Sequence, residues 1–448
     1  MNVRSACSLM LLCLCLSVTK VFSQPSNAVF ANVVNGKSGS TVSNASNAAK
    51  FDNTYAELTA GTFTVFSTDA WLELGYDNEV VKGSFPTTLY IRISTTSPAF
   101  LNNMISVNAY NGNGSPVSLS GGGYKTFYTP DGNAYLAVSP SGNFKKVRVT
   151  VSPPALLGEM KLRIYYAFYG PTASNETNPY PFTSSDCGAP NVTSKAFTEA
   201  LLGAYNVENP GGAIDNDLNT KSSFATNGVV LDGFIKQTFH FNGPSNPSDG
   251  IRVVLSQSGS LLALDLGKSI SLTAYNGNDQ VGDAVFMSSL LRADLLTLLE
   301  NKSQIAFYVQ PTGTFDRVEI NLNVGLLGVG LGSNALNIHD VRRAPAMPTA
   351  PDVSVCTNIG TVLLSALSPQ NSIQNIGSFA YKWYKEISGT TTASTSQQWS
   401  LLNLTTAGEQ TYYVETVKSG TGCISSDRKA VKINVQNPPV TPDVALTP

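Results

Sequence analysis

The residues with the clearest capacity for chemistry lie in one acidic loop, DNDLNT at residues 215–220. Asp215, Asp217 and Asn219 occupy alternate positions, so a tight turn can bring their side-chain oxygens together with backbone carbonyls. Calcium prefers six to eight oxygen ligands of this kind. We therefore predict a calcium site here, and calcium is the one cofactor that the sequence suggests. Asx turns are the alternative, because these side chains also accept hydrogen bonds from nearby backbone N–H groups.

A run of aromatic residues, YYAFY at 165–169, is the second candidate site. Side chains alternate along a strand, so either Tyr166 and Phe168 or Tyr165 and Tyr169 point outward. An aromatic platform with a few polar groups is the usual construction of a sugar site. We predict that Tyr166 and Phe168 contact a ligand, with packing at a sheet edge or between domains as the alternative.

Residues for acid–base or nucleophilic catalysis are scarce. The two histidines, His240 and His339, lie far apart in the sequence, and alternation in KQTFHFN predicts that His240 faces solvent, opposite its aromatic neighbours. The chain has no G-x-S-x-G, HExxH or CxxC motif, so hydrolase and zinc chemistry lack their usual anchors. We predict that the protein is not an enzyme. Two distant carboxylates can still form a glycosidase pair, so a hydrolase stays the alternative.

Composition excludes a further class of function. With 28 basic and 30 acidic residues the net charge is −2, and no basic cluster occurs, so the sequence predicts no nucleic-acid partner. Charged residues make up only 13% of the chain, whereas glycine, serine, threonine and asparagine are abundant. This balance is typical of an exported all-β protein.

Residues 1–23 have the pattern of a signal peptide. Arg4 precedes the apolar run LMLLCLCL, and Val21 and Ser23 suit cleavage before Gln24. The run is too short to span a bilayer stably, and no other stretch of 18 apolar residues follows. We therefore expect a secreted or cell-surface protein with no membrane insertion after the signal is removed.

The candidate residues must be positioned by short strands. From about residue 25, apolar and polar residues alternate in blocks such as TLYIRIS and KVRVTV, which predicts antiparallel β-sandwiches. Two blocks end in the same pentapeptide, AYNGN, at 109–113 and 274–278, and Asn-Gly after alternating residues predicts a β-hairpin. Asp52 and Asp217 are separated by the same offset, since 217 minus 52 equals 274 minus 109. The sequence therefore predicts two homologous jelly-roll-like sandwiches.

The two copies differ at informative places. Lys50 stands where the second copy has Asp215, so calcium is expected in the second copy first. Tyr165 of the first copy corresponds to His339 of the second. The second copy also contains SSLLRADLLTLLENK at 288–302, whose leucines recur at helical spacing and predict a helix at an open end of the sandwich.

After Cys356 the pattern changes to that of a smaller sandwich. It combines this first-strand cysteine with a Y-x-W-Y strand at 381–384, a TYYV strand at 411–414, and a GC pair ending in Cys423 that precedes S-x-R and V-x-V elements. This arrangement resembles the Ig-like domains of very large exported surface proteins of gliding Gram-negative bacteria. The resemblance implies export through the type IX route and implies no catalysis.

Three cysteines remain after signal cleavage, namely Cys187, Cys356 and Cys423. An exported protein can form disulfides, so one pair and one leftover thiol is the expected count. Within the Ig-like pattern we predict a disulfide between Cys356 and Cys423, which Trp383 can cover. The pairing of Cys187 stays open.

The duplicated sandwich resembles galactose-binding-like, discoidin-type or jelly-roll domains, on a block of the form N-A-x-D-x-D-x-x-T followed by strands. In such domains the loop often holds a structural calcium and opposite loops bind sugars, and the resemblance implies the same here.

We predict an exported, non-catalytic, adhesin-like surface protein that binds a glycan or another extracellular ligand. One alternative is a purely structural spacer of a large surface protein, and another is an accessory part of a secreted polysaccharide-degrading enzyme. The expected organisation is a signal peptide (1–23), β-sandwich repeat 1 (24–171), a linker (172–194), β-sandwich repeat 2 (195–345), a linker (346–352), an Ig-like domain (353–436) and a Pro-rich tail or linker (437–448).

Overall fold

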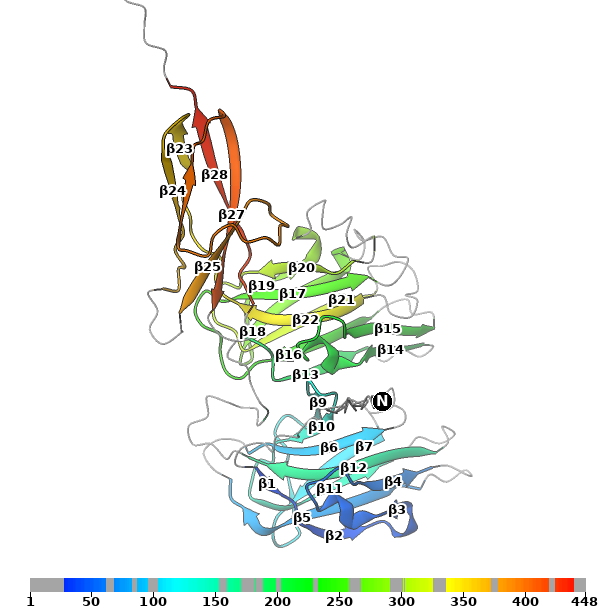
Figure 1. Cartoon of the computed structure of the whole chain (residues 1–448). Helices are drawn as coiled ribbons and strands as arrows, with labels where there is room; N and C mark the ends of the chain where they lie inside the picture. The colour runs from blue at the N-terminus through cyan, green and yellow to red at the C-terminus, as the bar shows by residue number, and fades with distance from the viewer. Residues whose placement is uncertain are drawn as a thin grey trace, which may run out of the picture.

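The fold of the 448-residue chain was obtained as a computed structural model. The described residues are 28–438 without 62–67, 83–86, 96–103, 153–158, 171–181, 183–187, 199–202, 229–232, 258–266, 291–300, 302, 325–335, 372–377 and 419–423. Their secondary structure is almost entirely β-strand with a few short helical turns, which confirms the prediction of an all-β protein (Figure 1). The signal peptide, Cys187, Cys423, most of the helix expected within 288–302 and most of the tail lie outside the described residues.

Module 1 is the N-terminal β-sandwich. Its strands are β1 (Val29–Phe30), β2 (Val33–Lys37), β3 (Val42–Ser43), β4 (Ala56–Ala60), β5 (Ala70–Val80), β6 (Leu89–Thr95), β7 (Ile105–Tyr110), β8 (Pro116–Val117), β9 (Lys125–Tyr128), β10 (Ala134–Val138), β11 (Phe144–Val151) and β12 (Met160–Tyr169), with 3-10 helices η1 (Gly39–Thr41) and η2 (Ala45–Ala48). One layer has the order β2-β5-β11-β7-β8, and the other runs β9-β10-β6-β12-β4-β3. Side chains alternate along these strands, so the inward set, including Leu72, Val147 and Leu162, forms one buried core.

Module 2 is the second β-sandwich. Its elements are β13 (Val192–Phe197), β14 (Gly203–Glu208), η4 (Pro210–Ala213), β15 (Ser222–Gly228), β16 (Phe234–His240), β17 (Gly250–Gln257), β18 (Ile270–Asn276), β19 (Asp279–Phe286), η5 (Met287–Ser289), β20 (Ile305–Val309), β21 (Arg317–Asn323) and β22 (Leu336–Ala344). The order β13-β16-β21-β18-β19 repeats β2-β5-β11-β7-β8, and β14-β15-β22-β17-β20 repeats β3-β4-β12-β6-β10. The two sandwiches therefore share one topology, as expected of a duplicated module.

Two local features repeat together with this strand order. The β12–β6 register shifts between Ile164 and Tyr166, and the β22–β17 register shifts between Ile338 and Asp340. The skipped residues are the pair that the sequence aligned, a tyrosine in module 1 and a histidine in module 2. Both AYNGN segments end a strand that continues antiparallel into the next strand, β8 or β19, so both predicted hairpins are confirmed. The second turn has Gly277 at φ +60°, a conformation that favours glycine.

The two modules are joined through a continuous sheet. Strand β13 of module 2 pairs with β9 of module 1 at Thr193 with Tyr128 and at Ser194 with Phe127, so twelve strands form one sheet across both modules (Figure 1). We call this pairing the seam. Strand β13 begins within the range 172–194 that the sequence assigned to a linker. Backbone hydrogen bonds therefore tie the modules together where a spacer was expected.

A buried histidine lies at the seam. His240 is 5% exposed, and its Nε2 lies 2.9 Å from the Ser194 hydroxyl. Its ring makes an edge contact with the Phe127 ring of module 1, with centroids 5.1 Å apart. The prediction of a solvent-facing His240 was wrong, because the face opposite the neighbouring phenylalanines is covered by the other module.

The C-terminal domain is a small sandwich. Its strands are β23 (Val353–Cys356), β24 (Thr361–Ser365), β25 (Phe379–Tyr384), β26 (Gln398–Leu402), β27 (Gly408–Lys418) and β28 (Lys429–Gln436), in sheets ordered β23-β28-β27-β25 and β24-β26. Trp383 is fully buried at the centre of the core, and its Nε1 donates a hydrogen bond to the Ser396 carbonyl. Gln370 connects this domain to module 2 by donating to Asp249 Oδ1 and to the Pro247 carbonyl, each at 2.8 Å.

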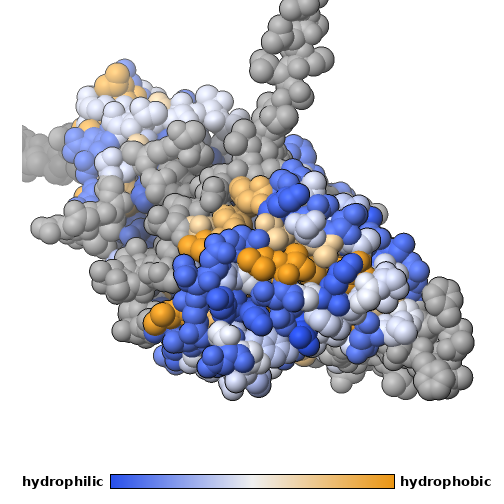
Figure 2. Space-filling model, turned by 90° about the horizontal axis from the view of Figure 1, so that it is seen from below, coloured by the Kyte–Doolittle hydropathy of each residue, from blue (hydrophilic) through white to orange (hydrophobic). Residues whose placement is uncertain are grey.

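Seen from the module 1 end, the surface is largely hydrophilic and carries a short apolar band (Figure 2). Among the described residues, no helix is long and apolar enough to cross a membrane.

Candidate functional site

A small solvent-open hollow lies on the outer face of module 1. It measures about 130 Å³ and is lined by Phe51, Asp52, Asn53, Arg92 and Tyr166. Strand β6 supplies the arginine, β12 supplies the tyrosine, and the loop between η2 and β4 supplies the other three residues. This pocket, called the hollow below, combines exposed aromatic surface with charged and amide groups.

Arg92 is the polar centre of the hollow. It sits between two core isoleucines of β6, so strand alternation turns its side chain to the outer face, where it is only 8% exposed. Its Nη1 donates to Asn53 Oδ1 at 3.0 Å, and its Nη2 donates to Asn133 Oδ1 at 2.8 Å. The guanidinium carbon lies 4.4 Å from the centroid of the Tyr165 ring. These contacts fix a cation at the hollow, and because the Asn53 side-chain oxygen accepts from Arg92, its amide nitrogen is the group that can donate to a ligand.

Aromatic rings form the apolar wall of the hollow. Phe51 is 38% exposed, and its ring centroid lies 5.0 Å from that of Tyr166 and 4.3 Å from that of Phe30. The Tyr166 hydroxyl lies 3.1 Å from the Tyr135 hydroxyl, which holds the ring in place. The structure therefore places Tyr166, one of the two aromatic residues predicted to contact a ligand, in the wall of this pocket.

The second predicted aromatic residue does not reach the surface. Phe168 is completely buried and packs against Tyr90, with ring centroids 5.4 Å apart and planes 22° apart. Phe30 of β1 and Phe182 of the interdomain segment also contact its ring. Phe168 thus supports the sheet and cannot touch a ligand, so this part of the prediction was wrong. Alternation chose the correct face, but it could not show that other segments cover half of that face.

Asp52 gives the hollow its negative charge. Its Oδ1 accepts hydrogen bonds from the backbone N–H of Thr54, at 2.8 Å, and from the Thr54 hydroxyl. The side-chain hydrogen bond, followed by the backbone one, lowers the pKa of Asp52 below its ordinary value. The carboxylate is therefore ionised at neutral pH, and its Oδ2 can accept from a ligand.

This arrangement suits a hydroxylated ring. A flat apolar face can lie on Phe51, while neighbouring hydroxyls can exchange hydrogen bonds with Arg92, Asn53 and Asp52. The volume is below the 300–1,000 Å³ that is common for drug-sized ligands, so the hollow fits a single ring rather than a chain of rings.

The acidic loop of module 2 is held together by its own side chains. Asp215 Oδ1 accepts from the Asp217 N–H at 3.0 Å, and Asp217 Oδ1 accepts from the Asn219 N–H at 2.9 Å. The Thr220 hydroxyl donates to both carboxylate oxygens of Asp215 at 2.7 Å. These are the bonds of successive Asx turns. Within the described part of the chain, no group of three or more His, Cys, Asp or Glu residues could hold a metal ion, and calcium stays a prediction.

The place in module 2 that corresponds to the hollow is filled by an ion-pair network. Asp340 occupies the position of Tyr166, and burial raises its pKa above the ordinary value. It accepts from Arg342 Nε at 2.7 Å and from Arg252 Nη1 at 2.9 Å. Arg342 also donates to Asn216 in the loop that matches the module 1 loop. The two copies therefore present different chemistry at the same topological position.

The prediction for the Ig-like domain is only partly tested. Cys356 is an exposed free thiol at the end of β23, and Cys423 lies outside the described residues, so the disulfide stays a prediction. The Trp383 ring packs toward Trp399, with centroids 6.0 Å apart, and its expected position over the bridge stays a prediction.

Sequence reasoning missed three residues of the hollow, namely Phe51, Asn53 and Arg92. An arginine between isoleucines in TLYIRIS was a visible signal, because an outward charge in an otherwise apolar strand needs a partner. Asn53 directly follows Asp52, which the repeat alignment had already singled out. Only the fold brings the Arg92 and Asn53 side chains together.

The comparisons with known proteins agree with the Ig-like assignment. Residues 345–438 match the family described as "Ig-like domain CHU_C associated", which covers the C-terminal domain and not the two modules. A comparison with curated proteins gives no match.

Solved structures give weak likenesses. A β-1,2-glucanase from Parabacteroides distasonis is 10% identical over 58% of this chain and 39% of its own, with a TM-score of 0.25. The adhesin domain of Epf from Streptococcus pyogenes is 8% identical over 56% of this chain and 93% of its own, with a TM-score of 0.20. The Clostridium perfringens structure titled CpGH89CBM32-4 is 11% identical over 36% and 98%, with a TM-score of 0.19. The chain thus spans well under half of the glucanase. At these TM-scores the likenesses do not assign a function to the chain.

Proposed function

We propose that the protein is an exported surface protein whose module 1 binds a carbohydrate without catalysis, through the hollow. The observation that carries this proposal is the exposed Phe51 ring beside the buried guanidinium of Arg92, with the amide of Asn53 and the carboxylate of Asp52 at the same opening. Stacking surface and fixed hydrogen-bonding groups side by side are what a sugar ring needs.

Binding without hydrolysis is supported by the charge of the hollow. Among the described residues that line it, Asp52 is the only carboxylate. A glycosidase of the usual type needs two carboxyl groups on either side of the scissile bond. Release of reducing sugar from polysaccharides by the purified chain would show that the alternative role in an enzyme is the correct one.

The test is a glycan array on the whole exported chain, followed by calorimetry with the glycan that binds. Phe51→Ala and Asn53→Ala change exposed residues and should leave the fold intact. Each should weaken binding about tenfold, which corresponds to about 1.4 kcal/mol. Phe234→Ala is the matched control, because Phe234 is an aromatic residue of module 2 with 36% exposure. Absence of binding to every glycan would favour the structural-spacer alternative, and equal binding by Phe51→Ala would remove the hollow as the site.

A further inference from the structure

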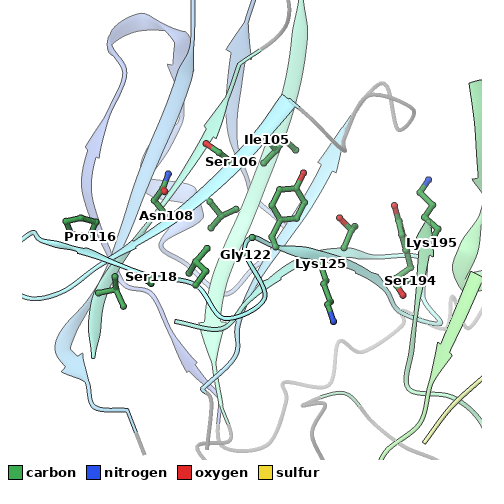
Figure 3. Close-up of a pocket in the computed structure, with 16 residues that line it drawn as sticks. Ile105, Ser106, Asn108, Pro116, Ser118, Gly122, Lys125, Ser194 and Lys195 are labelled. Atoms are coloured by element: carbon green, nitrogen blue, oxygen red, sulfur yellow. The ribbon is translucent and has the colours of Figure 1, made fainter. Parts of the chain in front are cut away.

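A second pocket, separate from the hollow, lies where the modules meet. This junction groove has a volume of about 910 Å³ and takes its walls from both modules (Figure 3). Module 1 contributes residues of β7, of β8 and of the segment up to Tyr128, and module 2 contributes Ser194 and Lys195. Its volume is near the upper end of what ligand pockets have, so it can hold several linked rings.

The groove lies at the end of the seam. The pairing of β9 with β13 covers two residue pairs, and Lys195 is the residue that follows the second pair on β13. Tyr128 and Lys195 lie on the same face of the sheet, because Lys195 is two positions from Thr193, the partner of Tyr128, and both line the groove together with residues of β7. Figure 3 shows Lys195 on one side of the groove and Ser106 and Asn108 on the other.

Lys195 is a half-buried cation of the groove, whose lining also includes the exposed Lys125. Its Nζ donates to Asn206 Oδ1 at 2.8 Å and to the Val207 carbonyl at 3.4 Å. Burial lowers the pKa of Lys195 to about 8, and the nearby Glu208 opposes that shift. None of the described residues that line the groove is a carboxylate. An anion arriving here would therefore meet a cation that has no acid beside it in the groove wall.

A tyrosine hydroxyl next to Lys195 is also unsatisfied. Tyr128 is 8% exposed, and within the described part of the chain its Oη has no hydrogen-bond partner. The Lys195 Nζ lies 5.4 Å from the centroid of its ring. Because the Tyr128 Oη is itself buried, a ligand in the groove is expected to pair with Lys195 and not with the Tyr128 hydroxyl.

The other residues that line the groove indicate what kind of molecule would bear the negative charge. Ser106, Asn108, Ser118 and Thr126 offer hydroxyl and amide groups, and Tyr124 adds an aromatic ring. We propose that the junction groove binds an acidic oligosaccharide, a chain of sugar rings with carboxylates, one of which pairs with Lys195. This site does not depend on the hollow, because the two pockets share no lining residue.

The test is calorimetry of the whole exported chain with trigalacturonic acid and with its fully methyl-esterified form, which keeps the rings and removes the charge. The acidic trimer should bind at least tenfold more tightly than the ester. Lys195→Gln should weaken binding of the acid by about tenfold or more. Ser106→Trp should block the groove from an exposed position without touching the contacts of Lys195.

Lys82→Gln is the matched control, because Lys82 is an exposed lysine of module 1 that lines neither pocket. It should bind the acid as the unmodified protein does. Binding that is equal for acid and ester, or that survives both Lys195→Gln and Ser106→Trp in proteins with unchanged melting curves, would overturn the proposal. So would tighter binding of a carboxylated peptide, such as triglutamate, than of the trimer. Asn53→Ala should leave this binding intact, so failure of either site is seen separately.

Discussion

Lowering the pH should loosen the seam, because the seam buries His240. The ring is covered by Phe127 of module 1, and its Nε2 contacts the Ser194 hydroxyl. Burial, followed by the charges of Arg317 and Lys125, lowers the pKa of His240 to about 3 from an ordinary value of 6.5. The folded protein therefore keeps this histidine neutral over a range in which the unfolded chain takes up a proton.

The size of the effect follows from the two pKa values. Because the folded value is the lower one, the stabilisation is complete above pH 6.5 and is lost as the pH falls toward 3. Between pH 7 and pH 4.5 the unfolded state gains about three-quarters of a proton at this site and the folded state almost none. The free energy of unfolding should fall by about 2.5 kcal/mol from this group alone.

Urea unfolding at a series of pH values measures this loss. The unmodified protein, His240→Gln and Ser194→Ala should be compared between pH 7 and pH 4.5. His240→Gln removes the titrating group, so its stability should fall about 2.5 kcal/mol less than that of the unmodified protein. Ser194→Ala removes the hydrogen bond and keeps the histidine, so it should lower stability at pH 7 and retain a steep dependence on pH. If His240→Gln and the unmodified protein show the same slope, burial of the histidine at the seam is not what controls stability in acid.

Three further predictions concern other parts of the chain. A Cβ added at Gly211 would lie 2.3 Å from the Thr129 carbonyl oxygen across the module boundary. Gly211→Ala should therefore destabilise the joined modules by about 1–3 kcal/mol, measured by thermal melting. Gly360→Ala is the control, because a Cβ at Gly360 meets nothing within 4 Å and should not change stability. Adding a chelator tests the calcium prediction: a drop in melting temperature that added calcium reverses would confirm it, whereas an unchanged melting temperature would show that Asp215 only accepts hydrogen bonds within its own loop. Trp383→Ala should destabilise the Ig-like domain by about 3–5 kcal/mol in urea unfolding, since the ring is fully buried, and a loss below 1 kcal/mol would contradict its central place in that core.

The sequence by itself determined the class of fold and the duplication. Alternation of apolar residues is a local property, because it reflects which face of each strand is buried, and it predicted strands such as β6 and β11. The repeated AYNGN turns and the matching of Tyr165 with His339 gave the correspondence between modules. That correspondence is confirmed by the shared strand order and the shared register shift.

Only the tertiary structure decided which of these residues are accessible and what they meet. Phe168 and His240 stand at positions where alternation allowed exposure, but segments distant in sequence cover both. The hollow joins Arg92 to Asn53, which lie 39 positions apart, and the junction groove needs Lys195 beside Tyr128 from the other module. Such contacts depend on how sheets pack and on how modules join, and neither is encoded in the period of a single strand. In the folded protein, the side chains of the acidic loop at 215–220 form hydrogen bonds within the loop and stabilise its turns.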